Sequence, residues 1–213
     1  MNIIIFGATG NVGSRIVVEA LSREHEVTAV VRSSAEFDRL PAGVNVRSAD
    51  AGDAALVAQL VKGQDVVISA IRPPEGQEDL LPVLTKSVLD GAAIADVRTI
   101  VVGGAASLAM HADTEVTVLD APNFLPDSVV PIARACFAQY EMIMAHDAAD
   151  WSYICPPAML APGERKGHYR LGTNHLVLAS DGKSSISMED FALAILEEAE
   201  TPQHSMRRFT VGY

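Results

Sequence analysis

The sequence has few cysteines, no long apolar run and no histidines at the spacing of a metal site, so it lacks features of secreted, membrane-spanning and metal-binding proteins respectively. Its two cysteines, Cys136 and Cys155, are too few for a disulfide framework, and we interpret them as small apolar packing residues in a reducing compartment. The longest apolar or small stretch, Ile100–Met110, is about half as long as a membrane-spanning helix, so no transmembrane segment is expected. The six histidines lack the spacing of a metal site, and we expect no bound metal.

Basic residues are also scarce. The sequence has 16 lysines and arginines against 27 aspartates and glutamates, which gives a net charge of −11. This balance argues against nonspecific nucleic-acid binding, because clustered Lys and Arg are needed to hold phosphate backbones. An anionic ligand would have to be held locally, by a few placed arginines, helix N-termini and backbone amides. Because an apolar stretch follows Met1 at once, without a basic leader, we expect no secretory signal and a cytoplasmic location.

The residues that are present predict one globular domain with an α/β fold. Hydrophobic residues make up 49% of the chain and charged residues 20%, close to globular averages. Apolar runs typical of buried strands alternate with segments of helical spacing, as in a Rossmann-type doubly wound parallel sheet. The strands predicted in this first part are Asn2–Phe6, Glu26–Val31, Val44–Ser48, Asp65–Ser69 and Arg98–Val102, and the helices are Val12–Ser22, Asp53–Val61 and Leu80–Ala95.

The second half of the chain is less regular. We interpret the long loop Ala105–Val130 as an active-site loop, because compact domains rarely keep such a loop without a function. After it we expect a helix at Pro131–Ala149, a strand at Trp151–Cys155, a short antiparallel pair at Lys166–Leu171 and His175–Ala179, a helix from its cap Ser187 to Glu200, and a last strand at Arg207–Val211. About residues 1–155 would form the core of the domain, and about residues 156–213 a small C-terminal substrate lobe.

The strongest local signal is a glycine-rich turn after the first predicted strand, Gly7-Ala-Thr-Gly-Asn-Val-Gly13. In a dinucleotide-binding turn of this spacing, Gly7 permits the tight turn, Gly10 lets the backbone approach the pyrophosphate, and Gly13 lets helix and strand pack closely. Backbone amides at the start of the helix then face the anion. The alternative is a turn that happens to be rich in glycine, but its place between a strand and a helix favours cofactor binding.

The ends of the next strands indicate which dinucleotide would bind. Where an NAD enzyme usually has Asp or Glu, the second strand ends at Arg32, whose guanidinium suits the 2′-phosphate of NADP. We therefore expect NADP, with NAD less favoured, and the alternative is that Arg32 is a solvated loop charge. Fold position also predicts Asp50 near the adenine amino group and Ser69, Ala70 and Ile71 beside the adenosine ribose.

Several segments together resemble a known family. The glycine turn and Arg32 are joined by Val101-Val-Gly-Gly-Ala-Ala-Ser107, Trp151-Ser-Tyr-Ile-Cys-Pro-Pro157 and Pro162-Gly-Glu-Arg-Lys-Gly-His-Tyr-Arg-Leu-Gly172. With these motifs the chain resembles the atypical short-chain dehydrogenase/reductases over nearly its whole length. It is most similar to their NmrA-like NAD(P)-binding group, which includes proposed NADH-flavin reductases. The glycine turn is shared across a large superfamily, whereas its combination with the late Pro-Gly-Glu-Arg segment is more specific.

The resemblance implies roles for individual residues. Those that would hold the dinucleotide are Gly7, Thr9, Asn11, Val12 and Arg32. Those that would lie beside the nicotinamide are Gly103, Gly104 and Ser107, and those that would shape the substrate side are Pro156, Pro157 and Met159.

One departure from the family concerns the proton donor. Typical members use Tyr-x-x-x-Lys, in which the lysine lowers the pKa of the tyrosine so that the phenol can act as a general acid. None of the four tyrosines here has lysine four residues later: Tyr140 is followed at that spacing by Met144, and Tyr153 by Pro157. Tyr140 and Ser107 remain candidate catalytic residues, with a packing tyrosine and a satisfied loop serine as the alternatives.

The missing pair narrows the expected chemistry to hydride transfer from NADPH to a small planar acceptor such as a flavin or quinone. Solvent would supply the proton, and the protein would mainly hold two rings in contact, with Ser107 orienting one of them. The alternative is a redox-sensing regulator that binds NADP, catalyses nothing and acts through a protein partner. Reduction or epimerisation of a sugar or small carbonyl ranks last, because it needs an acid that we do not identify. The oligomeric state is left open.

Overall fold

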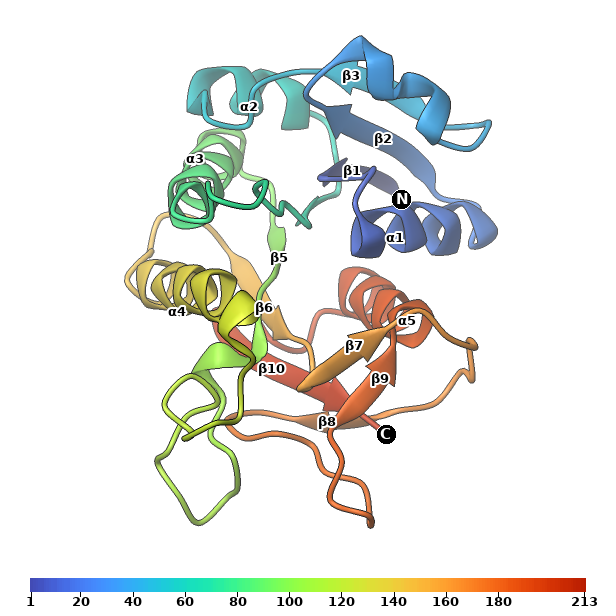
Figure 1. The fold of residues 1–213 in the computed structure, drawn as a ribbon. Coiled ribbons are helices and arrows are strands. Elements are labelled where there is room, and N and C mark those ends of the chain that lie inside the picture. Colours follow the sequence, from blue (N-terminus) through green and yellow to red (C-terminus); the bar gives the residue numbers. More distant parts are fainter.

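A computed structural model describes the chain apart from the side chain of Ser34. Its main sheet has eight strands in the order β3-β2-β1-β4-β5-β6-β10-β8. These strands are β1 (Asn2–Phe6), β2 (Glu26–Val31), β3 (Asn45–Ser48), β4 (Val66–Ser69), β5 (Thr99–Val102), β6 (Trp151–Cys155), β8 (Arg170–Gly172) and β10 (Arg207–Gly212). All neighbours pair in parallel except β8, which runs antiparallel to β10. The Rossmann-type α/β fold is therefore confirmed (Figure 1).

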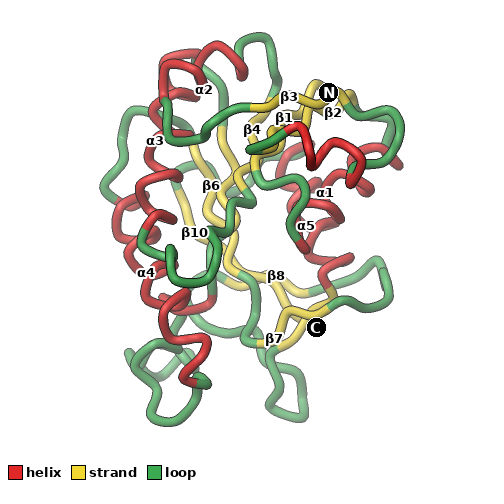
Figure 2. Tube along the Cα trace, turned by 45° about the horizontal axis from the view of Figure 1, so that its top comes forward, coloured by secondary structure: helices red, strands yellow, loops and turns green.

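Helices cover both faces of this sheet. On one face α1 (Asn11–Ser22) packs against α5 (Met188–Glu200); on the other, α3 (Leu80–Ala95) lies between α2 (Ala54–Val61) and α4 (Val130–Met144). Figure 2 shows the two layers of helices in red with the strands in yellow between them. Burial on both faces explains why β1 is apolar after Asn2. Ile3 and Ile5 belong to the core beneath α1 and α5, and Ile4 and Phe6 to the core on the opposite face.

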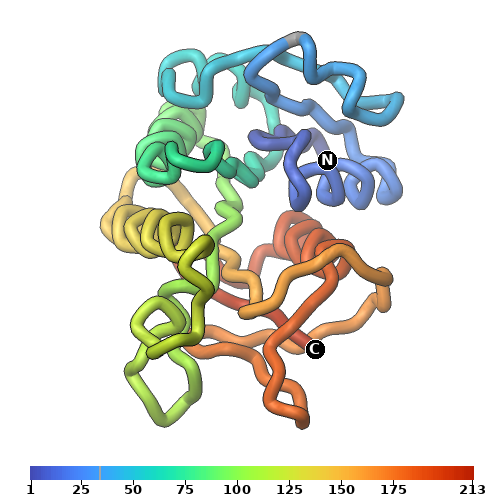
Figure 3. Tube along the Cα trace, in the orientation of Figure 1, coloured from blue at the N-terminus to red at the C-terminus, as the bar shows by residue number. Residues whose placement is uncertain are grey.

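The chain reverses its direction across the sheet between β1 and β4. From β1 it moves outward to β2 and β3, and it then returns to the other side of β1 for β4, β5 and β6. Figure 3 shows the resulting layout, with the N-terminal segments in blue in one half of the molecule and the C-terminal segments in orange and red in the other half. In doubly wound sheets such a reversal leaves a crevice at the carboxyl ends of the strands, where ligands bind.

The predictions for the C-terminal region are partly wrong. The expected antiparallel pair does not form: Arg170–Gly172 pairs with the edge of β10 instead, and His175 makes one isolated bridge to Ala109. The helix expected at Pro131–Ala149 ends at Met144, where the amides of the next two residues turn back onto carbonyls three residues earlier. Strands β7 (Met159–Ala161) and β9 (Ser185–Ser187) form a small parallel sheet that was not predicted.

The long loop between β5 and α4 is packed against the core. It contains two short 3₁₀ turns, η2 (Ala105–Ser107) and η3 (Asp127–Val129). Within it Leu108 and Val118 are buried with residues of α4 and β6, and the amide of Val118 donates to the Leu108 carbonyl at 2.8 Å. Among the described residues, no helix combines the length and hydrophobicity that a membrane crossing requires.

Candidate functional site

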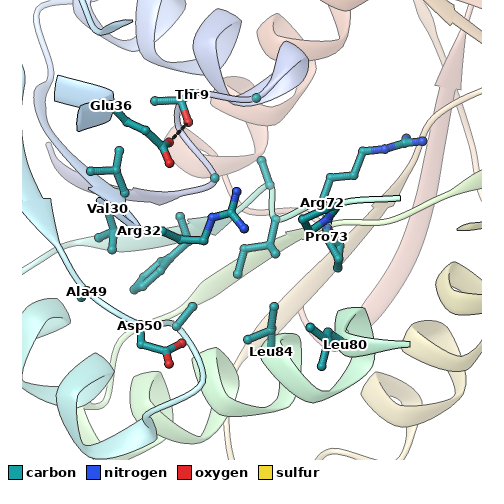
Figure 4. Close-up of a pocket in the computed structure, with 18 of the residues that line it drawn as sticks. Thr9, Val30, Arg32, Glu36, Ala49, Asp50, Arg72, Pro73, Leu80 and Leu84 are labelled. Carbon is teal, nitrogen blue, oxygen red and sulfur yellow. Dashed lines mark hydrogen bonds between the residues drawn. The ribbon is translucent and has the colours of Figure 1, made fainter. Parts of the chain in front are cut away.

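A cavity of about 360 Å³ opens at the carboxyl ends of β1, β2, β3 and β4, which is the switch point of the sheet. Seven of the predicted cofactor-binding residues line it: Gly7, Thr9, Gly10, Arg32, Asp50, Ala70 and Ile71. The structure also brings to its wall residues that sequence reasoning missed, among them Glu36, Arg39, Arg72, Leu80 and Leu84. Figure 4 shows Arg32 pointing into the middle of this cavity, with Leu80 and Leu84 of α3 beneath it.

Two of the three glycines of the turn, Gly7 and Gly13, are required by a close contact. Gly7 has φ +78°, and a Cβ there would lie 2.4 Å from the carbonyl oxygen of Ala70 after β4. A Cβ on Gly13 would lie 2.1 Å from the Gly7 carbonyl oxygen, so α1 packs directly onto the turn. Gly10 closes the turn by donating its amide to the Gly7 oxygen at 3.0 Å. Such a turn fits a dinucleotide, because its backbone reaches the cavity without a side chain in the way.

The start of α1 is open to an anion. The helix begins at Asn11 after Gly10, and no side chain of the described residues caps it. The amides of Asn11, Val12 and Gly13 therefore have no intrahelical acceptor and carry the positive end of the helix dipole. Asn11 is exposed, while the side chain of Val12 packs on the core, so these residues would act through their backbone.

A polar rim is held above the turn by η1 (Ser34–Arg39). The hydroxyl of Thr9 donates to Glu36 Oε2 at 2.6 Å, and Arg39 Nη2 donates to the Thr9 carbonyl at 3.0 Å. Arg32 is exposed and makes no side-chain hydrogen bond or ion pair with the described residues. Its guanidinium is therefore available to a ligand.

The residues predicted at the ends of β3 and β4 differ in whether they reach the cavity. Asp50 lines the cavity while its Oδ1 accepts the Gly52 amide at 2.8 Å. Ala70 and Ile71 form part of the wall. Ser69 instead is 1% exposed, its hydroxyl lacks a hydrogen-bond partner in the described structure, and it does not line the cavity. Ser69 is the last residue of β4 and is buried within the sheet, whereas Asp50, Ala70 and Ile71 come after the ends of their strands, where the cavity opens.

The residues expected beside the nicotinamide follow β5 and β6 at the same edge of the sheet, outside the cavity wall. A Cβ on Gly103 would lie 2.1 Å from Tyr153 Cζ, and a Cβ on Gly104 would lie 2.7 Å from Cys136 Sγ. The absence of side chains there is thus needed for packing of the turn on β6 and α4. Pro156 and Pro157 are buried after β6, and Met159 is 61% exposed at the start of β7.

The two candidate catalytic residues meet at Arg208 of β10. Arg208 Nη1 donates to the Ser107 carbonyl at 2.8 Å and to its hydroxyl at 3.1 Å, and Nη2 donates to Asn174 at 2.8 Å. The guanidinium carbon lies 4.5 Å from the centre of the Tyr140 ring, a cation–π contact. Ser107 and Tyr140 do not line the cavity. No sequence pattern indicated Arg208, because it reaches them only through the pairing of β10 with β6.

The two cysteines are free. Burial raises the pKa of the Cys136 thiol to about 11, against a smaller lowering by the positive charge of Arg72. Burial raises the pKa of Cys155 to about 12, with Arg208 acting in the opposite direction. Both thiols are therefore protonated at neutral pH, and the described residues contain no cluster suited to a metal ion.

The Pro-Gly-Glu-Arg segment lies across α1 and α5, away from the cavity. Arg165 binds the Glu19 carboxylate of α1 through two hydrogen bonds of 2.9 Å. The amides of Lys166 and Gly167 donate to the buried carboxylate of Asp190, at the start of α5. This segment therefore fastens the C-terminal region to the two helices that cover one face of the sheet.

Comparison with known proteins identifies the family. A family model described as NAD(P)H-binding matches residues 7–202. The uncharacterized protein YwnB of Bacillus subtilis (strain 168) is 33% identical over 213 residues, which cover 99% of this chain and 98% of that protein.

Solved structures agree with this match. A proposed epimerase of Bacteroides thetaiotaomicron is 36% identical, with a TM-score of 0.89 over 99% of this chain and 96% of that chain. A proposed NADH-flavin reductase of Streptococcus pneumoniae is 29% identical, with a TM-score of 0.86 over 100% and 99%. A proposed exported protein of Burkholderia pseudomallei is 36% identical, with a TM-score of 0.88 and full coverage of both chains, 100% each. The chain therefore belongs to the NAD(P)H-binding family, in agreement with its resemblance to the atypical short-chain dehydrogenase/reductases, and its cofactor is a nicotinamide dinucleotide.

Proposed function

We propose that the protein is an NADPH-dependent oxidoreductase that passes hydride to a small planar acceptor such as a flavin or a quinone. The observation that supports this most is the shared cavity of the glycine turn and the free guanidinium of Arg32. The relative from Streptococcus pneumoniae, a proposed NADH-flavin reductase, supports the class of acceptor. The two free cysteines suit a reducing compartment, and we place the activity in the cytoplasm.

The residues present fit a dinucleotide along the cavity. Amides of the turn and of the first residues of α1 would hold the pyrophosphate. Arg32 would pair with the 2′-phosphate, for which its planar donors are suited, and Asp50 would accept a hydrogen bond from the adenine amino group. Ala70 and Ile71 would pack beside the adenosine ribose. When bound, NADPH would supply the hydride that, with a proton from solvent, reduces the acceptor by two electrons.

The acceptor side would lie at the ends of β5 and β6, beside Gly103, Gly104 and Pro156, and we assign it to a substrate lobe of about residues 156–213. Ser107 would orient one of the rings through its hydroxyl group, whose oxygen accepts a hydrogen bond from Arg208. Tyr140 packs against Arg208, and we assign it a supporting contact rather than proton transfer. A flavin or quinone tolerates this arrangement, since no general acid of the protein is needed to reduce it.

Steady-state oxidation of NADPH with riboflavin, FMN and quinones tests the activity, alongside calorimetric titration with NADPH and NADH. We expect turnover with at least one flavin or quinone. Tight cofactor binding without turnover on any of them would favour the redox-sensing regulator, and absence of binding to either dinucleotide would remove both.

The choice of NADP over NAD depends on Arg32. We expect Arg32→Asp to weaken NADPH binding by about tenfold to a hundredfold, because a charge-assisted bond to phosphate contributes about 1.5–3 kcal/mol, and to leave NADH nearly unchanged. The control is Arg47→Asp, which makes the same change at an exposed arginine of β3 outside the cavity. Calorimetric titration of both cofactors gives the ratio of dissociation constants, and an unaltered ratio in Arg32→Asp would remove this arginine from the site.

A further inference from the structure

Arg72 is a second arginine of the cavity whose position is set by a rigid segment. It follows Ala70 and Ile71 at the carboxyl end of β4 and lines the cavity wall. Pro73, which is buried, and Pro74 come directly after it, and two consecutive prolines restrict the backbone around Arg72. The side chain itself is exposed. The base of this arginine is therefore fixed while its guanidinium is accessible.

The guanidinium of Arg72 makes no ion pair or hydrogen bond with the described residues, although the chain carries 27 acidic residues against 16 basic ones. Four other arginines, Arg15, Arg23, Arg98 and Arg165, each contact a carboxylate. Arg47 and Arg134 contact none within the described structure, but they are exposed outside the cavity. In the cavity wall, Arg39 is held by the Thr9 carbonyl. An unpaired cation in the wall of a cavity, in a chain with so many carboxylates, is available to an anion from outside.

Arg72 serves a different part of the site from Arg32. Figure 4 shows its side chain extending away from Arg32, on the opposite side of the cavity. The positive charge of Arg72 lowers the pKa of the Cys136 thiol of α4, although burial raises this pKa by more. Cys136 in turn packs against Gly104, where a Cβ would lie 2.7 Å from Sγ. Arg72 therefore lies on the side of the cavity that faces α4 and the turn after β5, and the proposed acceptor would lie beside this turn.

We infer that Arg72 binds an anionic substituent of the acceptor, so that the preferred substrates are flat rings that carry a phosphate or carboxylate. The inference deepens the proposed function and rests on it. Guanidinium donors suit both anions, because their planar geometry matches two oxygens at once. Within one class of acceptor, the protein thus prefers the anionic member over the neutral one.

Riboflavin and FMN test this directly, because they share the reacting ring and differ by one phosphate. We expect the wild-type protein to reduce FMN with a kcat/KM at least about tenfold above that for riboflavin, since one charge-assisted contact is at stake. In Arg72→Gln the advantage of FMN should disappear through a higher KM, with kcat and the riboflavin values retained. Arg72→Lys should restore part of it. Arg47→Gln, outside the cavity, is the matched control.

A second measurement separates this inference from the proposed activity. Quenching of flavin fluorescence on the NADP-loaded protein reports binding without turnover, and FMN should bind more tightly than riboflavin in the wild type but not in Arg72→Gln. If turnover fails while this preference is present, the proposed activity is wrong and the role of Arg72 stands. Equal affinity of the wild type for the two flavins, including no affinity for either, overturns the inference. A loss of NADPH affinity in Arg72→Gln overturns it as well, because the arginine would then hold the cofactor.

Discussion

Single residues of the turn differ in what an added methyl group would meet. At Gly13 a Cβ would collide with backbone, 2.1 Å from the Gly7 carbonyl oxygen. At Gly10 the nearest atom is the same oxygen at 3.2 Å, and φ of −74° is accessible to any residue. Gly10 also lines the cavity, so its methyl group would stand between the backbone and a bound pyrophosphate. An alanine at Gly13 therefore tests the packing of the turn, whereas an alanine at Gly10 tests the binding of the cofactor.

From this difference we expect opposite outcomes for two alanine variants. Gly13→Ala should lower the free energy of unfolding by roughly 3 kcal/mol or more, because backbone must move to relieve the overlap. Gly10→Ala should change it by less than about 1 kcal/mol but weaken NADPH binding about tenfold or more. Urea denaturation and calorimetry on both variants check this. Full affinity in a stable Gly10→Ala protein would show that the backbone at this position does not approach the cofactor.

Two further single residues, Arg32 and Arg72, carry unpaired positive charges at the cavity of an acidic chain. Both are exposed at strand ends, and in the described structure neither is neutralised by the protein itself. Local sequence indicated Arg32, since it occupies the position where related folds distinguish the two dinucleotides. Arg72 follows β4, which lies on the other side of β1 from β2. A search for cations after every strand that ends at this edge of the sheet would have found it.

At the scale of elements, the segment Pro162–Gly172 connects parts of the chain that are distant in sequence. Hydrogen bonds from Arg165 to Glu19 link it to α1, and amides bound by Asp190 link it to α5. The hydrogen bonds from Arg165 are the main cause of a lowered pKa of Glu19, assisted by Arg23 and opposed by burial. Since the folded-state pKa lies below its ordinary value, the ionised carboxylate stabilises the folded state.

We expect this link to depend on pH with a defined sign. A depressed carboxylate pKa contributes stability that is present above its ordinary value of 4.5 and lost as the pH falls through the lower folded-state value. Arg165→Ala should therefore lower the free energy of unfolding by roughly 1 kcal/mol at neutral pH, the estimate for a pair with one arginine half exposed. The difference from wild type should shrink below pH 4.5.

Urea denaturation of the wild type and of Arg165→Ala, at pH values above and below 4.5, measures this difference in the free energy of unfolding. Arg134→Ala is the control, because Arg134 is exposed on α4 and has no ion pair within the described structure. A difference between Arg165→Ala and wild type that stays constant with pH would show that packing of the arginine, and not the charge of Glu19, holds the segment.

At the scale of the whole molecule, the cofactor cavity forms only when the sheet is assembled. The cavity wall takes residues from the ends of four strands and from α3, and the chain reverses direction in their midst. A cofactor that binds this arrangement binds the folded state alone. Its binding free energy is therefore added to the free energy of unfolding.

Added NADPH should raise the melting temperature of the protein in proportion to this binding free energy. At a concentration one hundredfold above its dissociation constant it would add about 2.7 kcal/mol, which corresponds to roughly 5–10 °C for a domain of this size. Differential scanning fluorimetry with increasing NADPH measures the shift, and Gly10→Ala at the same concentration should show a smaller one. A melting temperature that is independent of NADPH would contradict the placement of the cofactor in this cavity.

By itself the sequence determined the order of strands and helices through α3, the glycine turn and the position of Arg32. These features depend on local periodicity, on glycine spacing and on the rule that parallel strands end at a common edge. Only the tertiary structure decided how the late strands pair, because a strand pattern indicates burial but not a partner. It placed Arg170–Gly172 against β10, and not against the residues that follow it. It also brought Arg208 to Ser107 and Tyr140, because such contacts join residues far apart in the chain. It buried Ser69 outside the cavity wall, because the burial of a strand residue depends on how the sheet and helices pack.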